Sequence, residues 1–262
     1  MKRAILSTGL ALALAAPAFA DVTIKQTTNG KGMGMSAAGT TVTYIKGMKM
    51  RSEVVTGDTT RTTIFDVENQ KMYSFDSKKK EADVWDMAAF AAEMQKSVDV
   101  GEMKASVKAT GQTKQIAGKT ATGYDMEISV PSTMGGKDGL KMTILLTGPM
   151  WVVKGAPGTA DYMAFYKAAV EKGWIFSDPR AAKGSPGQAK AMAEMYKQLA
   201  ETGGVPYETE MNIKLAGDGP MAGMMAKMGG MSATSAVQSV DTSSLDAALF
   251  APPAGYKLNQ KK

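Results

Sequence analysis

Residues 40–76 read TTVTYIKGMKMRSEVVTGDTTRTTIFDVENQKMYSFD, and this stretch decides the fold class. Runs rich in Thr, Val, Ile, Tyr and Phe alternate with turn sequences at Gly47, at Gly57-Asp58 and at residues 68–71. Short strands separated by turn residues at this spacing are typical of an antiparallel meander. Four consecutive strands are therefore predicted, at residues 40–45, 50–56, 59–67 and 72–75.

Further strands are predicted on both sides of this meander. Residues 21–28 are rich in Val, Ile and Thr, and we expect the Gly-rich stretch 30–39 to connect them to the meander. In residues 124–130 apolar side chains alternate with polar ones, which predicts a half-buried strand. The remaining predicted strands are 142–146, 150–154, 205–215 and 234–240.

Three amphipathic helices are expected to interrupt the strands. Asp86 can cap the first, and Asp161 can cap the second, which ends at Gly173. The third begins with a capping box, with Ser185 as the cap and Pro186 as the first helical residue. Their apolar faces are Met87, Phe90, Ala91, Met94 and Val98, then Tyr162, Phe165, Tyr166, Ala169 and Val170, then Met192, Met195, Tyr196 and Leu199. The strands come first in the sequence, and the helices can pack on one sheet. This arrangement predicts an α+β domain.

The first 20 residues have the features of a secretory signal peptide. Lys2 and Arg3 give a positive start, and the apolar residues 4–16 are too few to span a bilayer. Ala18-Phe19-Ala20 is a small-x-small cleavage site before Asp21. We therefore expect residues 1–20 to be removed and residues 21–262 to form one periplasmic domain, with no membrane span in the mature form.

The composition limits the chemistry. The chain has no His and no Cys, which excludes Ser-His-Asp triads, Cys nucleophiles, zinc fingers, iron–sulfur clusters and disulfides. Its net charge of +6 forms no basic stripe interleaved with aromatics, and the run 78–80 falls in a predicted turn, so no nucleic-acid partner is expected. The paired carboxylates Asp125/Glu127 and Glu208/Glu210 are expected to face solvent. We expect no cofactor and no enzymatic activity.

Four sequence blocks carry a resemblance to a known family. They are YIKGMKMR (44–51), IFDV (64–67), KMYSFD (71–76) and FAPPAGYK (250–257). These blocks resemble an uncharacterised family of exported bacterial proteins, which is itself similar to the periplasmic carriers of the outer-membrane lipoprotein-localisation system. The resemblance implies a curved antiparallel sheet, an unclosed half-barrel, with helices over its concave face. It also implies that an acyl chain is held between sheet and helices, and it brings no catalytic residue.

The 22 methionines are the feature that ordinary core-building does not predict. The densest group lies in a Gly-rich stretch and consists of Met221, Met224, Met225, Met228 and Met231. If Pro220 opens a short helix, the first four share one face. Because thioether side chains adapt to varied apolar surfaces, these five residues are predicted to bind a lipid or another hydrophobic small molecule, as in a carrier protein.

Other interpretations of the methionines stay open. Met221, Met224, Met225 and Met228 can form a Cu(I) site, because thioethers select this soft ion. Exposed methionines can also scavenge oxidants by forming the sulfoxide, or they can be simple filler. A structural or accessory envelope protein, with envelope proteins as partners and no small ligand, is a further alternative. The binding interpretation requires an apolar space between sheet and helices that the protein's own side chains leave unfilled.

Overall fold

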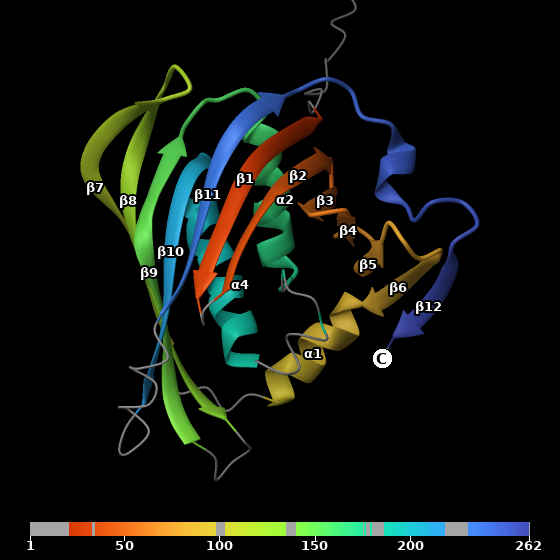
Figure 1. Ribbon diagram of the computed structural model, residues 1–262, viewed down its shortest axis with the longest axis horizontal. Helices are drawn as coiled ribbons and strands as arrows, with labels where there is room; N and C mark the ends of the chain where they lie inside the picture. The colour runs from red at the N-terminus through yellow and green to blue at the C-terminus, as the bar shows by residue number, and fades with distance from the viewer. Residues whose placement is uncertain are drawn as a thin grey trace, which may run out of the picture.

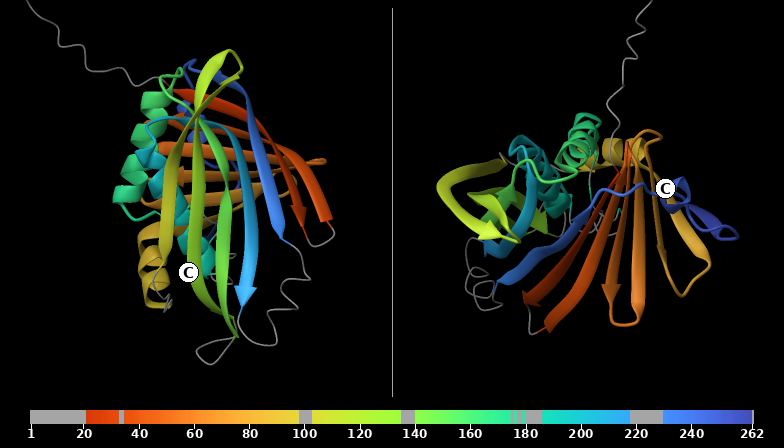
Figure 2. Two further views of the ribbon diagram at one scale, coloured as in Figure 1. Left: turned by 90° about the vertical axis from the view of Figure 1, so that its left-hand side faces the viewer. Right: turned by 90° about the horizontal axis from the view of Figure 1, so that it is seen from above.

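The computed structural model describes residues 21–32, 35–97, 103–134, 140–174, 176, 179, 186–217 and 230–261. In these residues twelve strands form one sheet, in the order β12-β6-β5-β4-β3-β2-β1-β11-β10-β9-β8-β7 (Figure 1). The edge strands β7 and β12 do not pair with each other in the described part of the chain, so the sheet is unclosed. Figure 2 shows the helices on one side of this curved sheet, which gives an α+β architecture.

The elements follow the chain in the order strands, helix, strands, helices, strands. The strands are β1 (Val22–Gly32), β2 (Met35–Lys46), β3 (Lys49–Thr56), β4 (Thr59–Asp66), β5 (Lys71–Asp76), β6 (Glu81–Asp86), β7 (Lys104–Ile116), β8 (Lys119–Met134), β9 (Leu140–Val153), β10 (Val205–Gly217), β11 (Met231–Asp241) and β12 (Lys257–Lys261). The helices are α1 (Met87–Ser97), α2 (Thr159–Glu171) and α4 (Pro186–Glu201), and a 3-10 helix covers Ala247–Phe250.

The predicted meander is confirmed as the antiparallel strands β2 to β5, with turns at Gly47 and Gly57. The prediction that residues 30–39 are a connection is wrong. Strands β1 and β2 pair without interruption from Val22 opposite Ile45 to Gly32 opposite Met35. Glycine suits this ladder because neighbouring backbone comes close: a Cβ added at Gly39 would lie 2.7 Å from the carbonyl oxygen of Val55.

The expectation of a wholly antiparallel sheet is also wrong, because β12 pairs in parallel with β6, from Lys257 opposite Glu81 to Lys261 opposite Trp85. The chain reaches this edge through the 3-10 helix Ala247–Phe250. Neither β6, β7 nor β12 was among the predicted strands. The polar sequence of β12 becomes a strand because a neighbouring edge is open to it, and pairing of this kind is set by tertiary context.

Helices α1 and α4 begin where the sequence predicts. The Asp86 carboxylate accepts a hydrogen bond from the backbone N–H of Ala89 at 2.9 Å, so the predicted cap is confirmed. Helix α4 begins at Pro186, as predicted, while its expected cap Ser185 lies outside the described residues. Within the described residues, no helix combines the length and the hydrophobicity that a membrane span requires.

The N-cap of helix α2 lies three residues before Asp161, the predicted cap. Its N-cap is Gly158, in the left-handed conformation with φ of 73°, and Asp161 lies in the first helical turn. A Cβ at Gly158 would lie 2.6 Å from Cγ2 of Val22, so the contact with β1 requires glycine here. The end of the helix is as predicted: α2 stops at Glu171, and Gly173 has φ of 69°.

The apolar faces of the helices pack on the sheet in two regions. The larger cluster joins all three helices to strands along the whole sheet, with aromatic side chains of α2 in it, and a smaller one joins α4 to β8 and β9. The alternation predicted for residues 124–130 is confirmed, since Met126, Ile128 and Val130 are buried while Asp125 and Glu127 are exposed. The two clusters together fasten the helices to the sheet.

A buried carboxylate ties the C-terminal segment to the start of the sheet. Asp21 Oδ2 accepts hydrogen bonds from Lys46 Nζ at 2.7 Å and from the backbone N–H of Leu245 at 2.6 Å. Lys46 Nζ also donates to the carbonyl oxygen of Leu245 at 2.9 Å. The three groups therefore hold β1, β2 and the segment before β12 together.

We expect the substitution Asp21→Asn to lower the free energy of unfolding by about 1.5–3 kcal/mol, because it removes a charge-assisted pair of hydrogen bonds that is largely shielded from water. Denaturant unfolding monitored by circular dichroism measures the change. Asp58→Asn is the matched control, since it breaks the fully exposed ion pair with Lys78 and should change stability little. Equal effects of the two substitutions would contradict the role given to Asp21.

Candidate ligand-binding pocket

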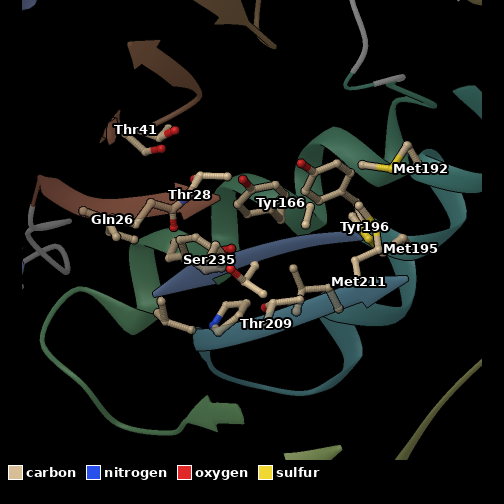
Figure 3. Close-up of a pocket in the computed structure, with 18 residues that line it drawn as sticks. Gln26, Thr28, Thr41, Tyr166, Met192, Met195, Tyr196, Thr209, Met211 and Ser235 are labelled. Atoms are coloured by element: carbon tan, nitrogen blue, oxygen red, sulfur yellow. The ribbon is translucent and has the colours of Figure 1, made fainter. Parts of the chain in front are cut away.

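A pocket of about 360 Å³ lies between the sheet and the helices α2 and α4, and it opens to solvent (Figure 3). Strands β1, β2, β10 and β11 form its floor, and the two helices form the opposite wall. Its volume lies at the lower end of the range of about 300–1,000 Å³ that is usual for small-molecule sites. The space between sheet and helices is thus partly filled by the core and partly left open.

The helical wall is lined largely by apolar side chains, and two of them are flexible methionines. Met192, Met195, Tyr196 and Leu199 lie on one face of α4, because residues three and four apart are neighbours on a helix. Met192 and Met195 also pack against the buried residues of β8 and β9, while Leu199 packs with Met150 of β9. The predicted stripe of α4 therefore both fastens the helix to the sheet and borders the pocket.

The floor of the pocket carries polar side chains. Thr209 of β10 lies opposite Ser235 of β11, and Ser235 lies opposite Thr28 of β1, so three hydroxyl-bearing residues form a row across three strands. We call these three residues the hydroxyl row. Beside it, Gln26 of β1 lies opposite Thr41 of β2. All five line the pocket, and within the described part of the chain none of their side chains has a hydrogen-bonding partner on that side of the sheet.

Tyrosines join the helical wall to the core. The rings of Tyr166 on α2 and Tyr196 on α4 are stacked, with centroids 5.3 Å apart and planes at 12°. The Tyr166 hydroxyl donates a hydrogen bond to Sδ of Met50 at 3.6 Å. Burial raises the pKa of the hydroxyls of Tyr162, Tyr166 and Tyr196 above the ordinary value. These three groups therefore remain neutral wherever the protein is folded near neutral pH.

The raised pKa values predict loss of stability at alkaline pH. In the unfolded chain these tyrosines ionise near pH 10, whereas in the folded protein they keep their protons. The unfolded state then binds fewer protons, so each such tyrosine lowers the free energy of unfolding by up to about 1.4 kcal/mol per unit of pH above that value. Denaturant unfolding at a series of alkaline pH values measures the slope. Tyr162→Phe should flatten it, and a slope unchanged by this substitution would contradict the account.

The described residues that line the pocket include no Asp, Glu, Lys or Arg. This lining is notable in a chain of which 21% is charged. Among the described residues, no three His, Cys, Asp or Glu side chains come together as a metal site. The groups that face the pocket are thus hydroxyls, one amide, thioethers, aliphatic side chains and aromatic rings, which can hold a ligand by burial and by neutral hydrogen bonds.

The predicted methionine site lies mostly outside the described residues. Met221, Met224, Met225 and Met228 fall in that part, so lipid binding and Cu(I) binding through them stay predictions. Met231 is described: it begins β11, pairs with Ile213 and closely approaches Gly32. The described residues around the pocket do not include Met231.

The residues of the pocket floor are not among those that the sequence predicts to bind a ligand. These residues can be recognised by a change from apolar to polar side chains along the side of each strand that faces the helices. In β1 this side changes from the apolar Ile24 to Gln26 and Thr28, and in β2 it changes from Ile45 to Thr43 and Thr41. An inward row that changes from apolar to polar marks the point at which the core ends and a solvated space begins.

The fold and pocket define a class of protein in which helices cover one side of a single unclosed sheet and leave a ligand-sized space. No family model matches the chain, and a search of curated proteins found no similar sequence. Among solved structures, PNGF-II in its C2 crystal form is 13% identical with a TM-score of 0.34, and the match covers 92% of this chain and 31% of PNGF-II. The chain thus spans about a third of the length of PNGF-II.

Two smaller structures match over most of both chains. A LolA superfamily protein from Nitrosomonas europaea is 6% identical with a TM-score of 0.29, covering 89% of this chain and 91% of that one. A DUF1329 family protein from Desulfovibrio piger ATCC 29098 is 10% identical with a TM-score of 0.30, covering 90% and 91%. The structural neighbours thus include a LolA superfamily protein and a DUF1329 family protein.

Proposed function

We propose that this protein is an exported, non-enzymatic binding or carrier protein that holds a lipid or another hydrophobic small molecule in a half-barrel, between the concave face of the sheet and the helices. The observation that carries the proposal is the open pocket of about 360 Å³ between α4 and the strands β1, β2, β10 and β11. Its helical wall offers apolar contact, and its size suits a small ligand.

The unequal filling of the space between sheet and helices supports this function. In the core that joins α1 and α2 to the sheet, the side chains of Phe65, Phe165 and Trp174 are buried. Between α2, α4 and the strands β1, β2, β10 and β11, the sheet carries hydroxyl and amide side chains, and a pocket stays open. An apolar chain that enters it gains about 0.8 kcal/mol for each methylene that it buries.

The methionines of the wall suit ligands of varied shape. Met192 and Met195 on α4 and Met211 on β10 border the pocket, and unbranched thioether side chains adapt to irregular apolar surfaces. We also propose, from the sequence pattern alone, that Met221, Met224, Met225, Met228 and Met231 bind the hydrophobic ligand. Residues 21–262 act as one periplasmic unit after removal of residues 1–20, and envelope proteins are its partners.

Binding of an uncharged fluorescent naphthylamine probe, followed by displacement with lipids, tests this function. We expect the probe to increase in fluorescence with the protein and a lipid with a dodecyl chain to displace it. Probe and lipid should compete for one site, because the pocket is too small to hold both. A protein that binds neither the probe nor any lipid would contradict the proposed function.

A further inference from the structure

The pocket has two chemically different sides, and together they restrict the class of ligand. One side is the apolar wall of α4 with Met192, Met195 and Leu199. The other is the sheet, with the hydroxyl row (Thr28, Thr209, Ser235) and the neighbouring Gln26 and Thr41. A ligand that fills this space contacts both sides at once, so each side sets a separate requirement.

A charged group is unfavourable anywhere in this pocket. The described lining contains no cation that could pair with a carboxylate or a phosphate, and no anion that could pair with an ammonium group. Moving an ion out of water is costly unless an opposite charge or several good hydrogen bonds compensate for it. A fatty acid anion or an anionic phospholipid headgroup would therefore have to stay outside the pocket, in water.

A pure hydrocarbon is unfavourable for the opposite reason. The side chains on the floor have no hydrogen-bonding partners among the described residues on that side of the sheet, so water satisfies them while the pocket is open. An alkyl chain laid along the floor would displace this water and leave hydroxyl groups without hydrogen-bonding partners. Leaving a buried polar group unpaired costs more free energy than one hydrogen bond contributes.

We infer that the ligand is an uncharged amphiphile whose hydroxyl or ester oxygens lie along one side of its apolar body, as in a neutral glycerolipid. Its oxygens exchange hydrogen bonds with the hydroxyl row, and its acyl chain lies against Met192, Met195 and Leu199. This inference rests on the proposed function and adds the lipid class. Hydroxyl side chains suit the task because each can both donate and accept, and can rotate to fit the ligand.

Three probes that share a dodecyl-length chain test the lipid class. Lauroylglycerol, laurate and dodecane are each used to displace the uncharged naphthylamine probe at neutral pH, where laurate is ionised. We expect lauroylglycerol to bind at least about tenfold more tightly than either of the others, which corresponds to one net hydrogen bond. Laurate or dodecane binding as tightly as lauroylglycerol would overturn the inference while leaving the proposed function intact. If none of the three nor the naphthylamine probe binds, both fail.

A double substitution tests the part played by the floor. Thr28→Val with Thr41→Val replaces two hydroxyls by methyl groups and keeps residues that favour strands. Affinity for lauroylglycerol should fall about tenfold, and affinity for dodecane should stay the same or rise. The control is Thr23→Val, on β1 but on the side of the sheet away from the helices, which should change neither affinity. Unchanged binding of lauroylglycerol by the double variant, with its circular dichroism spectrum intact, would overturn the inference.

Discussion

The substitution Phe165→Ala is expected to lower the free energy of unfolding by about 3–5 kcal/mol, because it removes a large buried ring and leaves a cavity. Phe165 is fully buried on α2, with its ring 5.4 Å from that of Tyr166 and 6.1 Å from that of Phe176. Alanine is the best helix former, so the loss reports packing rather than a change in the preference of the backbone.

Denaturant unfolding of the Phe165→Ala variant measures this loss. The matched control is Lys167→Ala on the same helix, an exposed position whose substitution should change stability by no more than about 0.5 kcal/mol. A loss below about 1 kcal/mol for Phe165→Ala would mean that α2 is not fastened to the sheet through this aromatic core. In that case the packing of Phe165 would not hold α2 in place as part of the pocket wall.

The substitution Ser235→Phe is expected to abolish binding of the naphthylamine probe. Ser235 lies at the centre of the hydroxyl row, with Thr28 on one side and Thr209 on the other. A phenyl ring on this residue projects from the floor into the space that the ligand needs, and a pocket of about 360 Å³ cannot hold both. The strand itself tolerates the change, since Phe favours strands and replaces no buried apolar side chain.

The matched control for this substitution is Ser239→Phe on the same strand. Ser239 lies opposite Lys25, is exposed, and faces away from the helices. Its ring therefore adds the same hydrophobic surface without entering the pocket, and probe affinity should stay close to that of the unchanged protein. Equal affinities of the two phenylalanine variants would place the bound probe elsewhere on the protein. Both variants should unfold cooperatively, which shows that a loss of binding is not a loss of folding.

The alternating strands and two of the helix starts could be predicted because their causes are local. Met126, Ile128 and Val130 alternate with polar residues, and that period alone assigns them to the buried side of β8. The Asp86 cap is a contact between residues three apart, so the sequence around it is sufficient. The cap of α2 was predicted wrongly because its start depends on Val22, which is distant in the sequence and packs against Gly158.

The parts that could not be predicted depend on pairing between distant segments. β12 is short and polar, and becomes a strand only by lying beside β6. In the Gly-rich stretch, residues 30–32 and 35–39 belong to the ladder of β1 and β2, because each strand pairs with the other there. The prediction of a methionine site rested on composition, while the pocket floor depends on which residues of four strands share one side. Thr28 and Ser235 are adjacent there although they are far apart in the chain.

If this protein is a carrier, the pocket between α2, α4 and the sheet binds a lipid. Native mass spectrometry of the protein after incubation with a total lipid extract tests this most directly. We expect a complex whose added mass is that of one uncharged lipid, and we expect Ser235→Phe to lose this complex while Ser239→Phe keeps it. A spectrum that contains only the mass of the free chain would contradict the central claim.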